Sequence, residues 1–172
     1  MKAFGFFIVI LVVLVSYQVK GQNLKGFYSQ LTQLNLPYNF SYEMHKHTSE
    51  TPLPVSLKSQ DVILQEFSAV ARVDIAANYY FIIVKKNYEE DFDNLFLLLA
   101  ISVEGNIVDS LPIDIKAEEN KGVDFSITAD KVIKIADSHD GQAKVSEYRF
   151  NNGKFQRGPV YRSVTASELG SF

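Results

Sequence analysis

Two long apolar runs, separated by a short acidic stretch, constrain the fold of this chain more than any other feature. The first lies within residues 79–86, which are dense in aromatic and β-branched side chains, and the second covers residues 95–103. Such residues favour the pleated surface of a strand. A tight turn centred on Gly105 follows, because glycine readily takes positive φ. We therefore predict three consecutive antiparallel strands over residues 78–108.

The second run is too uniformly apolar to leave one face in water. Residues 95–100 read Leu-Phe-Leu-Leu-Leu-Ala. Strands that are buried on both faces show such continuous apolar runs. We predict that this segment is a central strand. It would be covered by other strands on one side, and on the other side by a helix within residues 24–34 or by residues 62–67.

The C-terminal half repeats the same strand-and-turn pattern. Short turns rich in Asn, Asp and Gly lie at residues 137–141 and 151–153, between segments with alternating or apolar character. Strands spaced in this way are typical of antiparallel all-β domains. The predicted fold is mainly β, as a single antiparallel meander domain over residues 22–172 that forms a sandwich, an open barrel or a propeller-like sheet. Residues 157–172 would be a loose tail or an edge strand.

Before the meander, the sequence predicts a short N-terminal helix. Leu24, Tyr28 and Leu31 recur at helical spacing, which indicates an amphipathic helix over residues 24–33. Pro37 then disfavours helical geometry in the preceding residue.

Residues 59–67 are ambiguous between helix and strand. Ile63 and Phe67 share a face at a spacing of four residues, after Ser59 as a candidate N-cap, which favours one or two helical turns. Residues 70–76 alternate between apolar and charged side chains and are predicted to be a half-buried strand.

Residues 1–21 have the pattern of a targeting segment. Lys2 precedes an apolar stretch over residues 3–16, and Gly21 offers a small residue at a cleavage site before Gln22. The alternative is an uncleaved anchor, but the run is shorter than the about 20 apolar residues of a spanning helix. We predict a cleaved signal peptide and an exported protein that is periplasmic, cell-surface or secreted.

Composition narrows the classes of partner. The chain has 17 Lys and Arg against 20 Asp and Glu, and the acidic excess grows when Lys2 and Lys20 leave with the leader. An acidic chain without a basic cluster is not typical of nucleic-acid binding. The chain has no cysteine, so disulfides and a lipidated cysteine are excluded. We predict no nucleic-acid partner, no cofactor, and no stable membrane span after signal cleavage.

Four motifs carry a resemblance to a known group. They are Leu-Pro-Tyr at residues 36–38, Tyr-Phe-Ile-Ile-Val within residues 79–84, the strand and turn at residues 98–110, and Tyr-Arg-Phe-Asn-Asn-Gly-Lys-Phe at residues 148–155. The chain resembles an uncharacterised group of small exported bacterial envelope proteins, many of them lipoproteins. The resemblance implies a β-meander and an envelope location. It implies no activity and no functional residues, and this chain lacks the acylated cysteine of the lipoprotein members.

Two histidines form one candidate site. His45 and His47 would share a face of an extended segment with Glu43, because strand side chains repeat every second residue. Zinc sites use histidine together with carboxylates. This pattern supports an alternative function, a small secreted hydrolase or metal-dependent enzyme that uses His45, His47 and nearby carboxylates. A solvated loop is the competing interpretation.

Tyrosines form a second candidate site. Tyr79, Tyr80, Tyr88, Tyr148 and Tyr161 lie in or beside the predicted strands. A tyrosine on a sheet can bind carbohydrate or protein, because its ring is apolar and its hydroxyl forms hydrogen bonds. Core packing with the hydroxyl at the rim is the alternative. From these patterns we predict an exported, envelope-associated binding or structural module without catalytic activity, whose partner is an unknown envelope protein or glycan.

Overall fold

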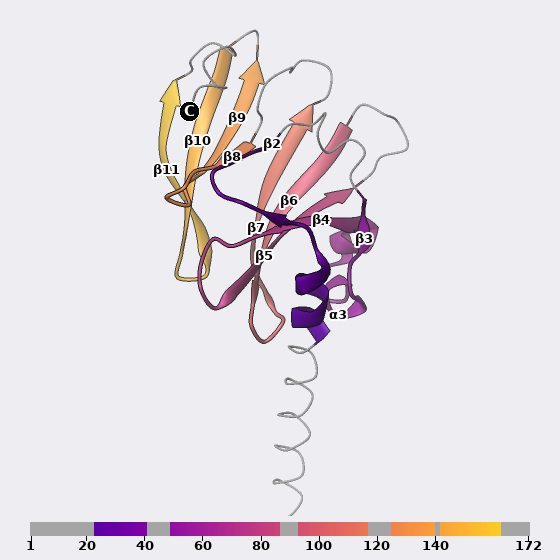
Figure 1. The fold of residues 1–172 in the computed structure, drawn as a ribbon. Coiled ribbons are helices and arrows are strands. Elements are labelled where there is room, and N and C mark those ends of the chain that lie inside the picture. The colour runs from indigo at the N-terminus through magenta and orange to yellow at the C-terminus, as the bar shows by residue number, and fades with distance from the viewer. Residues whose placement is uncertain (1–22, 41–48, 87–92, 117–124, 140–141, 163–172) are drawn as a thin grey trace, which may run out of the picture.

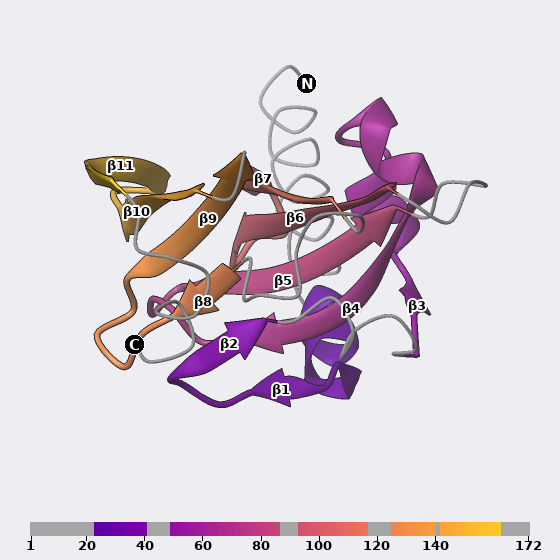
Figure 2. The same ribbon diagram turned by 90° about the horizontal axis from the view of Figure 1, so that it is seen from above.

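Two β-sheets lie face to face in the molecule (Figure 1; Figure 2). The computed structural model describes residues 23–40, 49–86, 93–116, 125–139 and 142–162. The fold is a meander-like β-sandwich, so the predicted mainly-β fold class is confirmed. Of the three arrangements that the sequence left open, the sandwich is the one formed.

Sheet A is built around the meander that the apolar runs predicted. Its strand order is β1-β4-β5-β6-β7, and β3 also pairs with β4. All neighbours are antiparallel except β1 and β4, which are parallel. The strands are β1 (Gln33–Leu34), β3 (Thr51–Pro52), β4 (Phe67–Val73), β5 (Tyr79–Lys86), β6 (Asp93–Ser102) and β7 (Ile107–Lys116).

Sheet B comes mainly from the C-terminal half of the chain. Its strand order is β11-β10-β9-β8-β2, and every pair is antiparallel. The strands are β2 (Tyr38–Phe40), β8 (Phe125–Ile127), β9 (Ile133–His139), β10 (Gln142–Asn151) and β11 (Lys154–Arg162). Residues 157–162 therefore form part of an edge strand, and residues 163–172 lie outside the described part.

The inner core fills the space between the two sheets. Phenylalanines from both sheets meet there: Phe40 of sheet B packs edge-on to Phe96 of sheet A, with ring centroids 4.9 Å apart. Phe81 of β5 packs in the same way against Phe150 of β10. Edge-to-face contacts of this kind are favoured by the charge distribution of the rings.

A second, outer core covers the other face of sheet A. It lies beneath a layer of short helical segments, which we call the cap: residues 23–30, the α-helix α3 (Val55–Lys58) and the 3-10 helix η1 (Val62–Glu66). Leu24, Leu57 and Leu64 of the cap are buried against sheet A.

Strand β6 shows the consequence of having two cores. Phe96, Leu98 and Ala100 belong to the inner core. The residues that alternate with them, Leu97, Leu99 and Ile101, belong to the outer core. β6 pairs with β5 on one side and β7 on the other. The prediction of a central strand buried on both faces is confirmed.

The local predictions before the meander need correction. The helix described at residues 23–30 ends before residue 33, because Gln33 and Leu34 pair with β4 instead. η1 begins after Asp61, not Ser59, and the Asp61 carboxylate accepts a hydrogen bond from the Ile63 N–H at 3.0 Å. Helix α3 was not predicted.

Candidate contact surface

The helix at residues 23–30 presents two adjacent stripes of side chains. Leu24 and Tyr28, with Leu31 just beyond the helix, form the stripe that is buried in the outer core. The second stripe, at positions 23, 26, 27 and 30, lines a groove beside α3. Residues three and four apart share a face of a helix. The buried stripe therefore fixes the direction in which the second stripe points.

Tyr28 anchors this helix to the end of β4. Its hydroxyl lies within hydrogen-bonding distance of two acceptors, the Val73 carbonyl oxygen at 3.1 Å and an Asp74 carboxylate oxygen at 3.0 Å. The Arg72 guanidinium lies 5.0 Å from the centre of the Tyr28 ring, and the Gln33 side-chain amide donates to Asp74 at 2.9 Å. Burial, and then the neighbouring Asp74, raise the pKa of Tyr28. The hydroxyl therefore stays protonated as a donor.

The groove lies between that helix and the start of α3. It has a volume of about 500 Å³. None of its lining residues is charged, and its apolar members come from both walls. The residues are Asn23, Gly26, Phe27, Gln30, Pro52, Pro54, Val55 and Ser56.

Three aliphatic side chains of the cap are exposed to water. Val55 is 81% exposed, Val62 is 79% exposed and Ile63 is 60% exposed. Ile63 and Phe67, whose spacing predicted the helical turns, differ in burial: Ile63 is exposed and Phe67 is buried. We call Phe27, Val55, Val62 and Ile63 together the cap surface.

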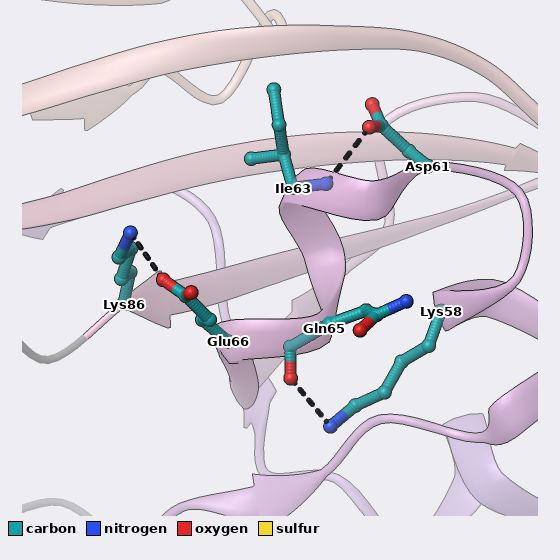
Figure 3. A network of polar contacts seen from close by, with 6 residues as sticks. All are labelled: Lys58, Asp61, Ile63, Gln65, Glu66 and Lys86. Carbon is teal, nitrogen blue, oxygen red and sulfur yellow. Dashed lines mark hydrogen bonds and ion pairs between the residues drawn. The ribbon is translucent and has the colours of Figure 1, made fainter.

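Polar contacts hold η1 in place (Figure 3). They do so although Val62 and Ile63 are exposed to solvent. At its start Asp61 caps the Ile63 N–H. The Lys58 ammonium donates to the Gln65 carbonyl oxygen at 3.0 Å, and Glu66 forms an ion pair with Lys86 of β5. Val62 and Ile63 are thus displayed from a fixed backbone.

The described tyrosines of the predicted binding site do not share one face. The Tyr79 ring packs on the inner-core side, 4.9 Å from the Phe150 ring. Tyr80 packs on the outer-core side, 4.7 Å from the Tyr28 ring. Tyr148 packs against the inner core from sheet B. Each of these three side chains is half-buried.

The other predicted site residues lie outside the described part of the chain. These are Glu43, His45, His47 and Tyr88, together with the side chain of Tyr161, whose backbone belongs to β11. Among the residues that the structure describes, no three His, Cys, Asp or Glu side chains are grouped closely enough to hold a metal ion.

Within the described ranges, no helix has the length and apolar character needed to cross a membrane. Comparisons with protein-family models, with curated proteins and with solved structures found no match.

The cap surface was missed by the sequence analysis. Its residues come from three segments, and their exposure depends on how the cap packs on sheet A. A local signal was present: Val55 directly follows Pro54, and Val62 and Ile63 directly follow Asp61. These apolar residues thus stand at the starts of very short helical segments, which are too short to turn every apolar side chain inward.

Proposed function

We propose that this chain is an exported, envelope-associated binding or structural module that contacts its partner through the cap surface, without catalysis of its own. The observation that carries this proposal is the exposure of Val55, Val62 and Ile63, at 60–81%. Val62 and Ile63 are adjacent in the chain, and exposed apolar side chains that adjoin mark interaction sites more often than singly scattered ones do. The apolar leader at residues 3–16 supports export.

The chemistry of the cap surface favours an apolar partner over a glycan. Three of its four side chains are aliphatic, whereas sugar contacts typically use exposed aromatic rings with hydrogen-bonding groups. Transferring a Val or Ile side chain from water to a fully apolar contact contributes at most about 1.5–3 kcal/mol. Because η1 is already held by Asp61 and Glu66, little ordering of the backbone would oppose binding.

The experiment is envelope fractionation of cells that produce the chain with its own leader in a bacterial host. Only the species from which the leader has been cleaved is followed, because an uncleaved leader would itself hold the chain at the membrane. We expect the unmodified protein to sediment with the envelope. We expect the double variant Val62→Asp/Ile63→Asp to move to the soluble fraction with an unchanged melting temperature, because both side chains are exposed.

Ala129→Asp is the matched control, because Ala129 is exposed in the turn between β8 and β9 of sheet B. It should sediment like the unmodified protein. If the double variant also stays with the envelope in full, the cap surface is not the contact and the proposal fails.

A further inference from the structure

The groove beside Asn23 lies next to the position where the described chain begins. Asn23 itself lines the groove. The apolar segment at residues 3–16 ends seven residue steps earlier in the chain. An extended connection of that length reaches about 25 Å at most, and a helical one about 10 Å.

This short connection restricts where the groove can lie. When residues 3–16 are inserted in a bilayer, Asn23 cannot be farther from them than the connection reaches. Phe27, Pro54 and Val55 line the same groove, so the connection also limits how far these residues can lie from the membrane.

The composition of the groove fits that location. Its lining residues carry no charge, although 22% of the chain is charged. Uncharged apolar side chains beside small polar ones suit the boundary between acyl chains and headgroups. Val55, at 81% exposed, is available for insertion.

We propose that this groove, with Val55 at its rim, contacts the lipid surface in the chain that still carries residues 1–21. This inference rests on the proposed function and names the partner of one part of the cap surface. A few side chains bind a membrane weakly by themselves. Tethering by the apolar segment raises their effective concentration at the surface, so the contact forms without a high intrinsic affinity.

The test uses the complete chain, residues 1–172, in vesicles of phosphatidylcholine. The chain has no cysteine, so Val55→Cys can be labelled uniquely with a fluorophore that responds to water. Ala129→Cys, in the turn between β8 and β9, is the matched control. Both positions are exposed, and melting curves verify that both labelled proteins are folded.

We expect emission from position 55 to shift to shorter wavelength and to lose most of its intensity when the vesicles contain nitroxide-labelled lipid. Position 129 should do neither. Diluting the protein at constant lipid concentration should leave the signal at position 55 unchanged.

Three outcomes overturn the inference. The fluorophore at position 55 could show the emission of a label in water. Its emission could shift without being quenched by the lipid nitroxide, or the emission shift could disappear on dilution. The second and third results would indicate contact with protein, including a second copy. In each case envelope association that depends on Val62 and Ile63 would still support the proposed function, so the two failures are distinguishable.

Discussion

Two tyrosines, the buried Tyr28 and the half-buried Tyr38, link the stability of the fold to alkaline pH. Burial raises the pKa of Tyr38 from its ordinary value of 10.0 to about 12. Burial and Asp74 raise the pKa of Tyr28 as well. In both cases the fold favours the neutral hydroxyl. Their contribution to stability is therefore complete below pH 10.0 and is lost as the pH rises through the folded-state pKa values.

We predict that the free energy of unfolding falls between pH 10 and 12, with Tyr38 contributing up to about 1.4 kcal/mol per pH unit. Tyr38→Phe removes the ionisable group and should make this fall less steep. Urea unfolding at several alkaline pH values measures the difference. Asn39→Ala, at an exposed position of the same strand, should keep the slope of the unmodified protein. An identical slope for Tyr38→Phe would contradict the assignment.

The environment of Lys85 could not be predicted from the neighbouring sequence. In the printed sequence it is the first of two lysines at the end of a predicted strand. In the structure it is only 6% exposed, and its ammonium lies 3.2 Å from Glu50 Oε1. A buried charge requires a partner. That partner is 35 residues away in the chain, so local sequence patterns could not identify it.

At the scale of elements, two short turns differ in how well their residues suit positive φ. The β10–β11 hairpin turns through Asn152 (φ 51°) and Gly153 (φ 79°). Positive φ at both central residues defines a type I′ turn, which matches the twist of the paired strands. In the β8–β9 connection, Lys131 adopts φ 63°, a region that costs an ordinary side chain about 1–2 kcal/mol.

We predict opposite effects of substitution at the two turns. Gly153→Ala should destabilise the fold by about 1 kcal/mol, because alanine is strained at positive φ. Lys131→Gly should stabilise it by about 0.5 kcal/mol, since relief of strain exceeds the entropy cost of glycine. Denaturant midpoints measure both. Asn152→Gly is the control and should change less than Lys131→Gly, because asparagine tolerates this conformation; a loss of stability in Lys131→Gly would contradict the prediction.

The two long edge strands carry features that discourage pairing with other chains. Pro112 lies in β7, at the edge of sheet A, where a missing N–H breaks no ladder. Pro159 lies in β11, at the edge of sheet B, where the register with β10 shifts. In addition, an Asp109 carboxylate oxygen accepts the Phe155 N–H at 2.7 Å, which occupies one edge donor of β11. Edge strands protected in this way resist edge-to-edge association.

The elements that the sequence predicted well are those specified by neighbouring residues. β5 has the bounds expected from its aromatic and β-branched run, and the turn at Gly105 has positive φ. β4 starts earlier than predicted, because a register shift between Ala69 and Ala71 interrupts its alternation. The parallel β1–β4 pair joins residues far apart in the chain, and α3 has four residues, which is too few for a periodic signal.

At the scale of the whole molecule, sheet A is a shared wall between two cores. Ile82 and Leu99 face the cap, whereas Ile83 and Leu98 face sheet B. Both faces of β5 and β6 carry large apolar side chains, so the cap and sheet B must both be in place to cover them. Loss of either layer would expose several large apolar side chains, each worth about 1.5–3 kcal/mol when fully buried.

Leu97→Asp tests this dependence on the cap. Leu97 is 9% exposed in the outer core, and an unpaired carboxylate there would cost several kcal/mol, comparable to the about 5–15 kcal/mol stability of a typical domain. We predict that the variant yields no soluble folded protein. Soluble yield and melting curves provide the measurement.

Ala129→Asp introduces the same side chain at an exposed turn and should change the free energy of unfolding by no more than about 0.5 kcal/mol. If soluble Leu97→Asp protein melted like the unmodified chain, the outer core would not be essential, and the role assigned to the cap would be wrong.

The burial of Leu24 has a consequence for the cleavage that the sequence predicts after Gly21. Leu24 is 1% exposed and lies three residues after Gly21, where the sequence predicts cleavage. Proteases cleave exposed segments that are not packed against the rest of the fold. Once Leu24 and Tyr28 are packed on sheet A, little free chain remains on the downstream side of the bond. If the chain is cleaved after Gly21 as the sequence predicts, removal of the leader would compete in time with docking of the first helix: prompt cleavage would release the domain, whereas a chain that folded first would keep residues 1–21.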